Sequence, residues 1–341
     1  MTSEIIEIDG SYESGGGQLL RVALSLSAIL GKPFVIKNIR SGRPNPGLRP
    51  QHLAGVQAMA KLTNASVSGA AVGSQKLSFT PNKITSEDYV LDIGTAGSVT
   101  LLAQSLVPAL LFGDKKSTIK LIGGTHVMWS PTIDYYRNVF IPLISRFGAS
   151  VSCFVDSFGW YPRGGGSATI EVNPSKLHSV DLTEKGLLYG MKGICALSNL
   201  KEEIADKQLA AAHEILPDLS IHKSIFPSQS PGTALTLWAE FQNSIVGASG
   251  IGRIGLKAED LGRTVALELK KELTSQATVD RWMSDQLLIF MALAKGRSSI
   301  IVPEITQHAK TCLWLIPKFT NIPFEDKDNK ISVKGMGEHL G

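Results

Sequence analysis

The chain has 341 residues, of which 43% are hydrophobic and 19% charged, so it is able to bury a large core and is not disordered. Its 34 basic and 30 acidic residues give a net charge of +4, which argues against a general polyanion binder but leaves local recognition of phosphates or RNA open. The three cysteines form no CxxC pair, which argues against a disulfide framework and a cysteine zinc site, and favours a reducing cytoplasm.

The amino-terminal half predicts repeated α/β units. The first unit has a strand at 5–8, a glycine loop at 15–17 and an amphipathic helix at 18–30 that ends at Gly31. A similar plan recurs at 89–93, 94–97 and 99–112, and a third copy is predicted from a strand at 118–122 and a helix at 133–147. Further β-branched runs lie at 34–39, 65–72 and 76–79.

The pattern changes near residue 182. A polar helix at 201–216, a β-rich passage at 234–246 and a helix at 258–273 predict a smaller inserted domain over 183–276. Apolar helical periodicity returns from residue 279, followed by a strand at 299–302 and a hairpin-like passage. We therefore expect a discontinuous main body, residues 1–182 plus 277–341.

The most apolar stretch, residues 99–112, is too short to span a bilayer and contains Gln104 and Pro108. The opening segment MTSEIIEIDG is acidic, unlike a targeting peptide. These features predict a soluble cytoplasmic protein that does not associate with membranes.

Two glycine-rich segments have to be interpreted. The first, residues 15–17 before Gln18 and Arg21, either binds an anion at a helix start or simply makes a tight turn. The second, Gly250, Gly252 and Gly255, spells GxGxxG, but no strand ending in an acidic residue follows its helix, so we do not interpret it as a dinucleotide site. No P-loop sequence is present.

Arginines cluster in a segment that is rich in proline and glycine. Arg40, Arg43 and Arg49 lie within ten residues, interleaved with prolines and followed by Gln51 and His52. Prolines prevent a helix before residue 50, so the segment is predicted to be a stiff loop whose guanidinium groups bind phosphate. The alternative is a solvated basic loop.

None of the seven histidines has the spacing of a metal site. His308 follows the strand-like SSIIV in the polar patch ITQHAKT, where an imidazole would be partly exposed and able to act as a nucleophile. A surface histidine without a role is the alternative, because a single histidine implies no mechanism without a partner. Asp285 and Gln286 are candidate partners, as is Asp134, which is close to Pro131 and to a stacking ring at Tyr135.

Several ordered motifs resemble those of the RNA 3′-terminal phosphate cyclase family. They are IDGSYESGGGQLLR (8–21), IRSGRPNPGLRPQHL (39–53), DIGTAGS (92–98), GGTHVMWSPTIDYY (123–136), YPRGGG (161–166), PGTALTLWAE (231–240), SDQLLIFMALA (284–294) and ITQHAKT (305–311). The resemblance implies a mixed α/β fold of repeated βαβαββ modules, like those of enolpyruvyl transferases, with a small inserted thioredoxin-like α/β domain.

The resemblance also implies an activity: ATP-dependent conversion of an RNA 3′-phosphate into a 2′,3′-cyclic phosphate. His308 takes the family's nucleophile position and would carry AMP covalently before passing it to the RNA end. Mg²⁺ or Mn²⁺ is the implied cation, and RNA 3′ ends and ATP are the implied partners, with no obligate protein partner evident.

The resemblance assigns the remaining site residues by position. The nucleotide would contact Gln104, Pro131, Tyr135, Trp282, Met283, Ser284, Asp285 and Gln286. Phosphates of ATP or of the RNA end would contact Arg21, Arg40, Arg43, Gln51 and His52. The family usually reads DGSxGEGGGQ, but Glu13 and Ser14 replace Gly-Glu here, so the carboxylate expected to hold the metal is displaced by one residue. Either Glu13 replaces it or metal binding is weaker or differently arranged.

Two other functions compete with the enzyme. A catalytically silent cyclase-like protein that binds RNA in ribosome assembly would lack the nucleophilic histidine, which is present here as His308. A small-molecule transferase on the same modules is disfavoured by residues 40–52 and by ITQHAKT, which match the cyclases instead.

Overall fold

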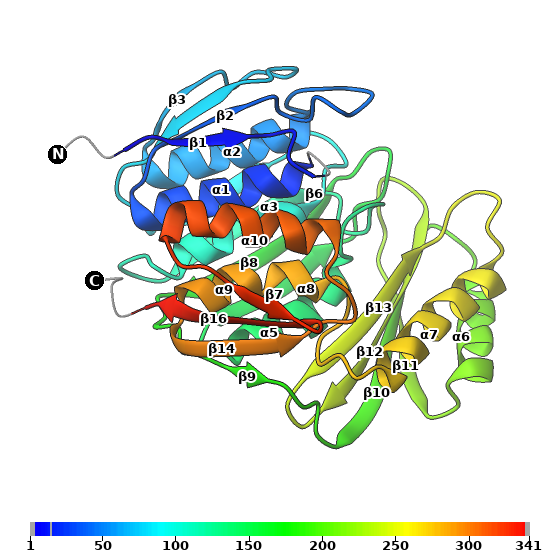
Figure 1. The fold of residues 1–341 in the computed structure, drawn as a ribbon. Coiled ribbons are helices and arrows are strands. Elements are labelled where there is room, and N and C mark those ends of the chain that lie inside the picture. Colours follow the sequence, from blue (N-terminus) through cyan, green and yellow to red (C-terminus); the bar gives the residue numbers. More distant parts are fainter. Residues whose placement is uncertain (1–3, 14–15, 338–341) are drawn as a thin grey trace.

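The computed structural model describes residues 4–13 and 16–337, and within them the fold contains three modules with one topology (Figure 1). Each module runs strand, helix, strand, helix, strand, strand, and its four strands have the spatial order first, second, fourth, third. The first two strands pair in parallel and the other pairings are antiparallel. The predicted α/β fold of repeated βαβαββ modules is confirmed.

The first two modules are continuous in sequence. Module 1 consists of β1 (Ile6–Asp9), α1 (Gly17–Leu30), β2 (Phe34–Lys37), α2 (Pro50–Thr63), β3 (Ser66–Ser68) and β4 (Leu77–Thr80). Module 2 consists of β5 (Tyr89–Asp92), α3 (Val99–Leu110), β6 (Ser117–Gly123), α4 (Ile133–Tyr135), the π-helix η1 (Tyr136–Phe140), α5 (Ile141–Ser145), β7 (Ser150–Ser157) and β8 (Gly166–Asn173).

The third module is interrupted after its first strand. It consists of β9 (Asp181–Leu182), α8 (Met283–Gln286), α9 (Leu288–Leu293), β14 (Lys295–Ile301), α10 (Gln307–Thr320), β15 (Glu325–Lys327) and β16 (Lys330–Met336). Strands β15 and β16 form the predicted carboxy-terminal hairpin. The expectation of a third copy at 118–147 is wrong, because β6 pairs with β5 and β8 and completes module 2.

The interruption holds a fourth sheet with two helices of its own. Its elements are β10 (Leu188–Ser198), α6 (Glu203–Ile215), β11 (Leu219–Ile225), β12 (Gly232–Phe241), β13 (Ile245–Ile251) and α7 (Ala258–Thr274). The sheet order is β11-β10-β12-β13, with only β10 and β11 parallel, an arrangement that fits the predicted thioredoxin-like unit. The domain boundaries themselves, 1–182 plus 277–341 and 183–276, stay a prediction.

The helices of the three modules pack on one another. Helix α1 contacts α2, α3 and α10, and the module sheets lie around these helices (Figure 1). One apolar core joins the three modules, whereas α6 and α7 pack on the inserted sheet around a separate core that includes Leu235, Leu237 and Val265. Consequently, the starts of α1, α8 and α10, which are far apart in sequence, are held by one rigid core.

The expected helix at 133–147 is continuous over 133–145, but its middle part, residues 136–140, is π-helical. Pro142 lies in the first turn of α5 and has no N–H to donate to the preceding turn, so regular α-helical bonding cannot run through it. Among the described residues, none of the helices is both long and apolar enough to cross a membrane. The cytoplasmic location stays a prediction.

Candidate active site at the start of helix α10

His308 is the second residue of α10, and its side chain is exposed. Thr306 caps this helix, because its side-chain oxygen accepts a hydrogen bond from the Ala309 N–H at 3.1 Å. The cap fixes the first turn, and Nδ1 of His308 contacts Oε1 of Gln18 on α1. The ring is therefore held from the side by a second helix.

The partners of Gln18 determine which way its amide points. Its Nε2 donates to a carboxylate oxygen of Asp285 and to Sγ of Cys312, the latter at 3.3 Å. Since only the NH₂ group can donate to an ionised carboxylate, Oε1 must face His308 and accept from Nδ1–H. The other ring nitrogen, Nε2, then keeps its lone pair, as a nucleophile requires.

Charge and burial favour the neutral imidazole. Loss of hydration, followed by the nearby positive charges of Arg21 and Arg43, lowers the pKa of His308 from its ordinary value. Burial raises the pKa of Asp285 to about 7, while Arg21 opposes the rise. Near neutral pH, the site thus combines a neutral histidine with a carboxyl group that is close to its titration midpoint.

Five predicted or neighbouring residues meet in one small pocket. Its polar lining consists of Gln18, Arg21, Gln104, Asp285 and Gln286, together with Ser25. The cavity volume is about 40 Å³, which is far too small for a nucleotide, so a nucleotide would have to lie across its mouth. Burial lowers the pKa of Arg21 to about 10, which leaves the guanidinium charged at neutral pH.

The predicted phosphate-binding loop lies beside this pocket. Arg40 has a φ of +54° and donates from its guanidinium to the Asn45 carbonyl at 3.1 Å, so the loop is folded back on itself. Nδ1 of His52 accepts from the Arg49 N–H at 3.1 Å. Burial and the charges of three arginines lower the pKa of His52 to about 3, so this ring is neutral and presents its other nitrogen toward α1.

Gly17, the first residue of α1, shows how closely the loop approaches. A Cβ at this position would lie 2.3 Å from Nε2 of His52, a distance that real atoms do not adopt. The last glycine of the glycine loop is thus required for packing against His52. Arg21 lines a second small cavity with Gln51 and His52, which brings three of the predicted phosphate-binding residues together.

The predicted nucleotide-contacting residues divide into two groups. Gln104 donates to Oε1 of Gln286 at 2.6 Å, and Trp282 is 45% exposed, so these side chains are accessible. In contrast, Tyr135, Met283 and Ser284 are almost fully buried. Pro131 is partly exposed and its carbonyl accepts from the Thr100 hydroxyl at 2.8 Å. The assignment of this whole set to a nucleotide stays a prediction.

Asp280 is a structural residue that the sequence analysis missed. It is buried and accepts from the Tyr135 hydroxyl at 2.7 and 2.8 Å, from the Gly247 N–H at 2.9 Å and from the Trp282 N–H at 2.9 Å. This carboxylate joins module 2, the inserted sheet and the start of α8. It therefore sets where Asp285 and Gln286 lie.

Glu13, the candidate metal ligand, is exposed in the turn after β1, with a φ of +51°. The neighbouring position of the displaced family carboxylate, Ser14, lies outside the described residues. Within residues 4–13 and 16–337, no three His, Cys, Asp or Glu side chains are grouped as a metal site would need. The assignment of Glu13 as a metal ligand stays a prediction.

Three α/β modules arranged around a histidine and several arginines define the structural class of this protein. The sequence matches the family RNA 3'-terminal phosphate cyclase over residues 12–325. An RNA 3'-terminal phosphate cyclase of Pyrobaculum neutrophilum is 41% identical over 327 residues, 94% of each chain. Another, of Methanosarcina mazei, is 40% identical and covers 96% of this chain and 98% of the relative. The chain belongs to the RNA 3'-terminal phosphate cyclase family and, as a member of it, is an enzyme.

Two solved structures match the chain more distantly. EPSP synthase of Acinetobacter baumannii matches with a TM-score of 0.41 and 13% identity, over 98% of this chain and 48% of that one. The enolpyruvyl transferase NikO of Streptomyces tendae matches with a TM-score of 0.29 and 13% identity, over 62% and 38%.

Proposed function

We propose that this protein converts RNA 3′-phosphate ends into 2′,3′-cyclic phosphates at the expense of ATP, with His308 as the nucleophile. The observation that carries the proposal is the contact between Nδ1 of His308 and the amide oxygen of Gln18. It supports a neutral ring that holds its proton on Nδ1 and offers Nε2 for attack.

The first step forms a covalent protein adenylate. Nε2 of His308 attacks the α-phosphorus of ATP, a P–N bond forms, the bond to the β-phosphate bridging oxygen breaks, and pyrophosphate leaves. Gln18 accepts from the Nδ1 proton throughout, and Asp285 holds the Gln18 amide in place. As the ring becomes positively charged on phosphorylation, the ionised Asp285 carboxylate nearby stabilises that charge.

The next two steps transfer AMP and close the ring. An oxygen of the RNA 3′-phosphate attacks the phosphorus of the adenylate, the P–N bond breaks, and AMP is joined to the RNA end. The adjacent 2′-hydroxyl then attacks the 3′-phosphorus, loses its proton and displaces AMP. Both reacting groups of this closure share one ribose, which favours it entropically and explains a requirement for RNA.

The arginines supply the counter-charge for these phosphates. Arg21 lies between the two small cavities, and Arg40 and Arg43 belong to the adjoining loop. Forked guanidinium donors bind phosphate oxygens in pairs and stabilise the charge that gathers on a five-coordinate phosphorus. Trp282 and Pro131 are the accessible apolar surfaces on which we place the adenine ring.

A divalent cation fits this site only in a limited way. Glu13 offers one exposed carboxylate, which suits Mg²⁺ or Mn²⁺ bound mainly through water and phosphate oxygens. When bound, the cation would neutralise the pyrophosphate leaving group. We assign Glu13 as its protein ligand.

Intact-mass measurement after incubation with ATP and Mg²⁺ or Mn²⁺ tests the proposal. The wild-type protein should gain one adenylyl group, and His308→Ala should gain none. Arg263→Ala, which removes an exposed ion pair on α7, is a matched control that should be labelled like wild type. A wild-type mass that is unchanged under both metals would refute the proposal and favour the catalytically silent RNA-binding alternative.

A further inference from the structure

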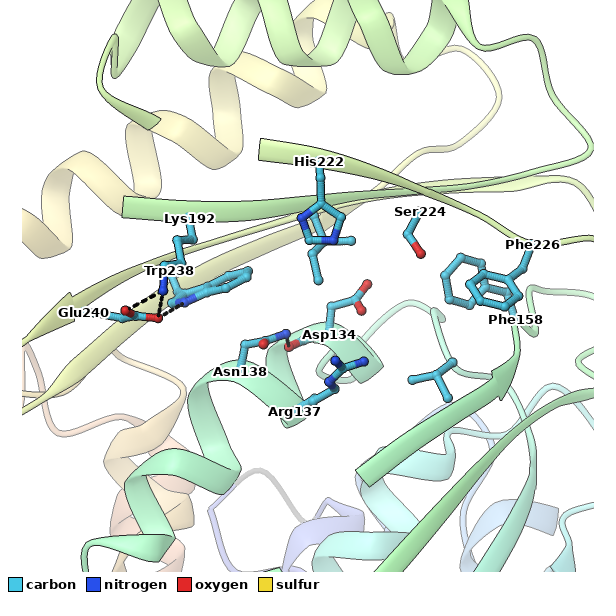
Figure 2. A pocket seen from close by; sticks show the side chains of 12 residues that line it. Asp134, Arg137, Asn138, Phe158, Lys192, His222, Ser224, Phe226, Trp238 and Glu240 are labelled. Carbon is cyan, nitrogen blue, oxygen red and sulfur yellow. Dashed lines mark hydrogen bonds and ion pairs between the residues drawn. The ribbon is translucent and has the colours of Figure 1, made fainter. Parts of the chain in front are cut away.

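A larger cavity lies outside the site around His308. It has a volume of about 440 Å³, is open to solvent, and separates the inserted sheet from α4, η1 and β7 of module 2 (Figure 2). Volumes of this size are typical of ligand sites, which often form between packed units of a chain. None of the residues predicted for the nucleotide or the phosphates lines it.

The inserted sheet presents a mixed face to this cavity, on which polar side chains lie beside the buried Ile194 and Trp238. On β11, His222 and Ser224 alternate with residues of the opposite face, and both line the cavity together with Phe226, which directly follows the strand. The opposite face of the sheet is apolar and is covered by α6 and α7. A sheet face that is buried for stability would carry apolar side chains, so hydroxyl and imidazole groups here indicate a surface kept open.

The two basic and two acidic side chains that line the cavity balance in formal charge, but Arg137 is not paired with either carboxylate. The two carboxylates are occupied, since Asp134 bonds His126 at 2.9 Å and Glu240 pairs with Lys192 at 2.8 Å. In the part of the chain that the structure describes, the side chains of Arg137 and His222 make no hydrogen bond or ion pair. Figure 2 shows Arg137 below the cavity, on the module side, and His222 above it on the inserted sheet. The Arg137 guanidinium is therefore available to an anionic group, and the His222 ring can add a hydrogen bond.

One end of the cavity is aromatic. The rings of Phe158 and Phe226 lie with their centroids 4.8 Å apart and line it together. Aromatic rings next to a guanidinium and a hydroxyl are the combination that binds single-stranded nucleotides, by stacking on the base and pairing with the phosphate. A free inorganic anion would make no stacking contact with these rings.

The cavity is also connected to the site around His308. Asp134, which forms part of its wall, directly precedes Tyr135, whose hydroxyl bonds to Asp280. Asp280 in turn accepts from the Trp282 N–H at the start of α8. These hydrogen bonds join one wall of the cavity to the start of α8, the helix that carries Asp285 and Gln286.

We infer that this cavity binds a nucleotide of the RNA strand upstream of its 3′ end, with Arg137 and His222 on the phosphate and Phe226 against the base. The inference rests on the proposed function, because it takes the bound strand to be the substrate. It assigns to the inserted unit a share in substrate binding, separate from chemistry at the terminal phosphate.

Equilibrium binding of two RNA 3′-phosphates, a dinucleotide and a ten-nucleotide strand, tests the inference without any catalytic step. Arg137→Ala and His222→Ala should each weaken binding of the longer RNA about tenfold, equal to about 1.4 kcal/mol, and leave the dinucleotide unaffected. Ser224→Trp, which fills the cavity without removing a charge, should have the same selective effect. Arg263→Ala on α7, behind the sheet, is the charge-matched control and should bind both RNAs like wild type.

Adenylylation with ATP alone should be unchanged in all three cavity variants. If both RNAs bind equally well to Arg137→Ala, His222→Ala and wild type, or if both RNAs lose affinity to the same extent, the inference is wrong. Failure of the wild-type protein to form an adenylate would instead overturn the proposed function, while the binding comparison would still decide whether RNA occupies the cavity.

Discussion

The buried carboxylate of Asp280 is the connection whose loss should have the largest structural effect. It accepts from the Tyr135 hydroxyl of α4, the Gly247 N–H of β13 and the Trp282 N–H before α8. Replacement by alanine would leave the first two donors buried and without an acceptor. Trp282 is partly exposed, so its N–H would be hydrated instead.

The expected loss of stability follows from the two donors that would stay buried, the Tyr135 hydroxyl and the Gly247 N–H. A buried donor left without a partner costs about 1–3 kcal/mol, so Asp280→Ala should lower the free energy of unfolding by about 2–6 kcal/mol. Tyr135→Phe is the matched control, because it removes one donor and leaves the carboxylate with its backbone partners. It should cost about 1 kcal/mol.

Urea unfolding followed by circular dichroism measures both values. A smaller loss of unfolding free energy for Asp280→Ala than for Tyr135→Phe would refute the reasoning. The hydrogen bonds from the backbone N–H groups to this carboxylate would then contribute nothing to stability. The two variants should also separate in activity, because displacement of α8 moves Asp285 and Gln286 in the alanine variant only.

The same residue gives a pH dependence with a definite sign. Burial raises the pKa of Asp280 from 3.8 to about 6, although the hydrogen bonds to the carboxylate oppose the rise. The folded state therefore binds this proton more tightly than the unfolded state, and stability falls as pH rises from about 4 to 6, by about 3 kcal/mol. Asp280→Asn should lack this component, and an unchanged pH profile in that variant would contradict the assignment.

Three further predictions concern the site and the thiols. Gln18→Leu removes the acceptor for the Nδ1 proton, so the rate of adenylylation should fall about 10- to 100-fold, measured by single-turnover labelling, while ATP still binds. Glu13→Ala should raise the cation concentration needed for half-maximal labelling, and Glu4→Ala, an exposed acid near the same end of the chain, should not. Burial raises the pKa of Cys153 and of Cys195 to about 12, so a thiol reagent should label neither until the protein unfolds; rapid labelling in the folded protein would contradict their burial.

The repeated α/β architecture was predictable from local sequence patterns, but the assignment of every strand and helix to its module was not. The glycine turns before residues 18 and 99 are real strand-to-helix turns of modules 1 and 2, because each precedes an apolar helix that packs in the shared core. The third module has no such glycine turn between its first strand and its first helix, because the inserted unit lies between them. Its first strand, β9, has only two residues and is separated from α8 by the whole inserted unit. The helical and strand patterns after residue 279 are visible in the sequence, but nothing local links them to β9 as one module.

The individual residues of the candidate site were predictable where they lie in recognisable motifs. The contacts between those residues were not predictable. His308 and Gln18 are 290 residues apart, and their contact depends on α1 and α10 packing side by side. Asp280 has no spacing that distinguishes it from an ordinary surface acid before a helix. The cavity lined by Arg137 and His222 exists only because two units of the fold face each other, which local sequence cannot encode in a recognisable form.

The most direct test of the proposed function isolates the adenylylated protein, removes all ATP, and adds an RNA with a 3′-phosphate. Our account predicts one turnover, in which the protein loses its adenylyl group, AMP appears in solution, and an equal amount of RNA acquires a 2′,3′-cyclic phosphate. An adenylate that persists, or that hydrolyses while the RNA end stays a 3′-phosphate, would contradict it.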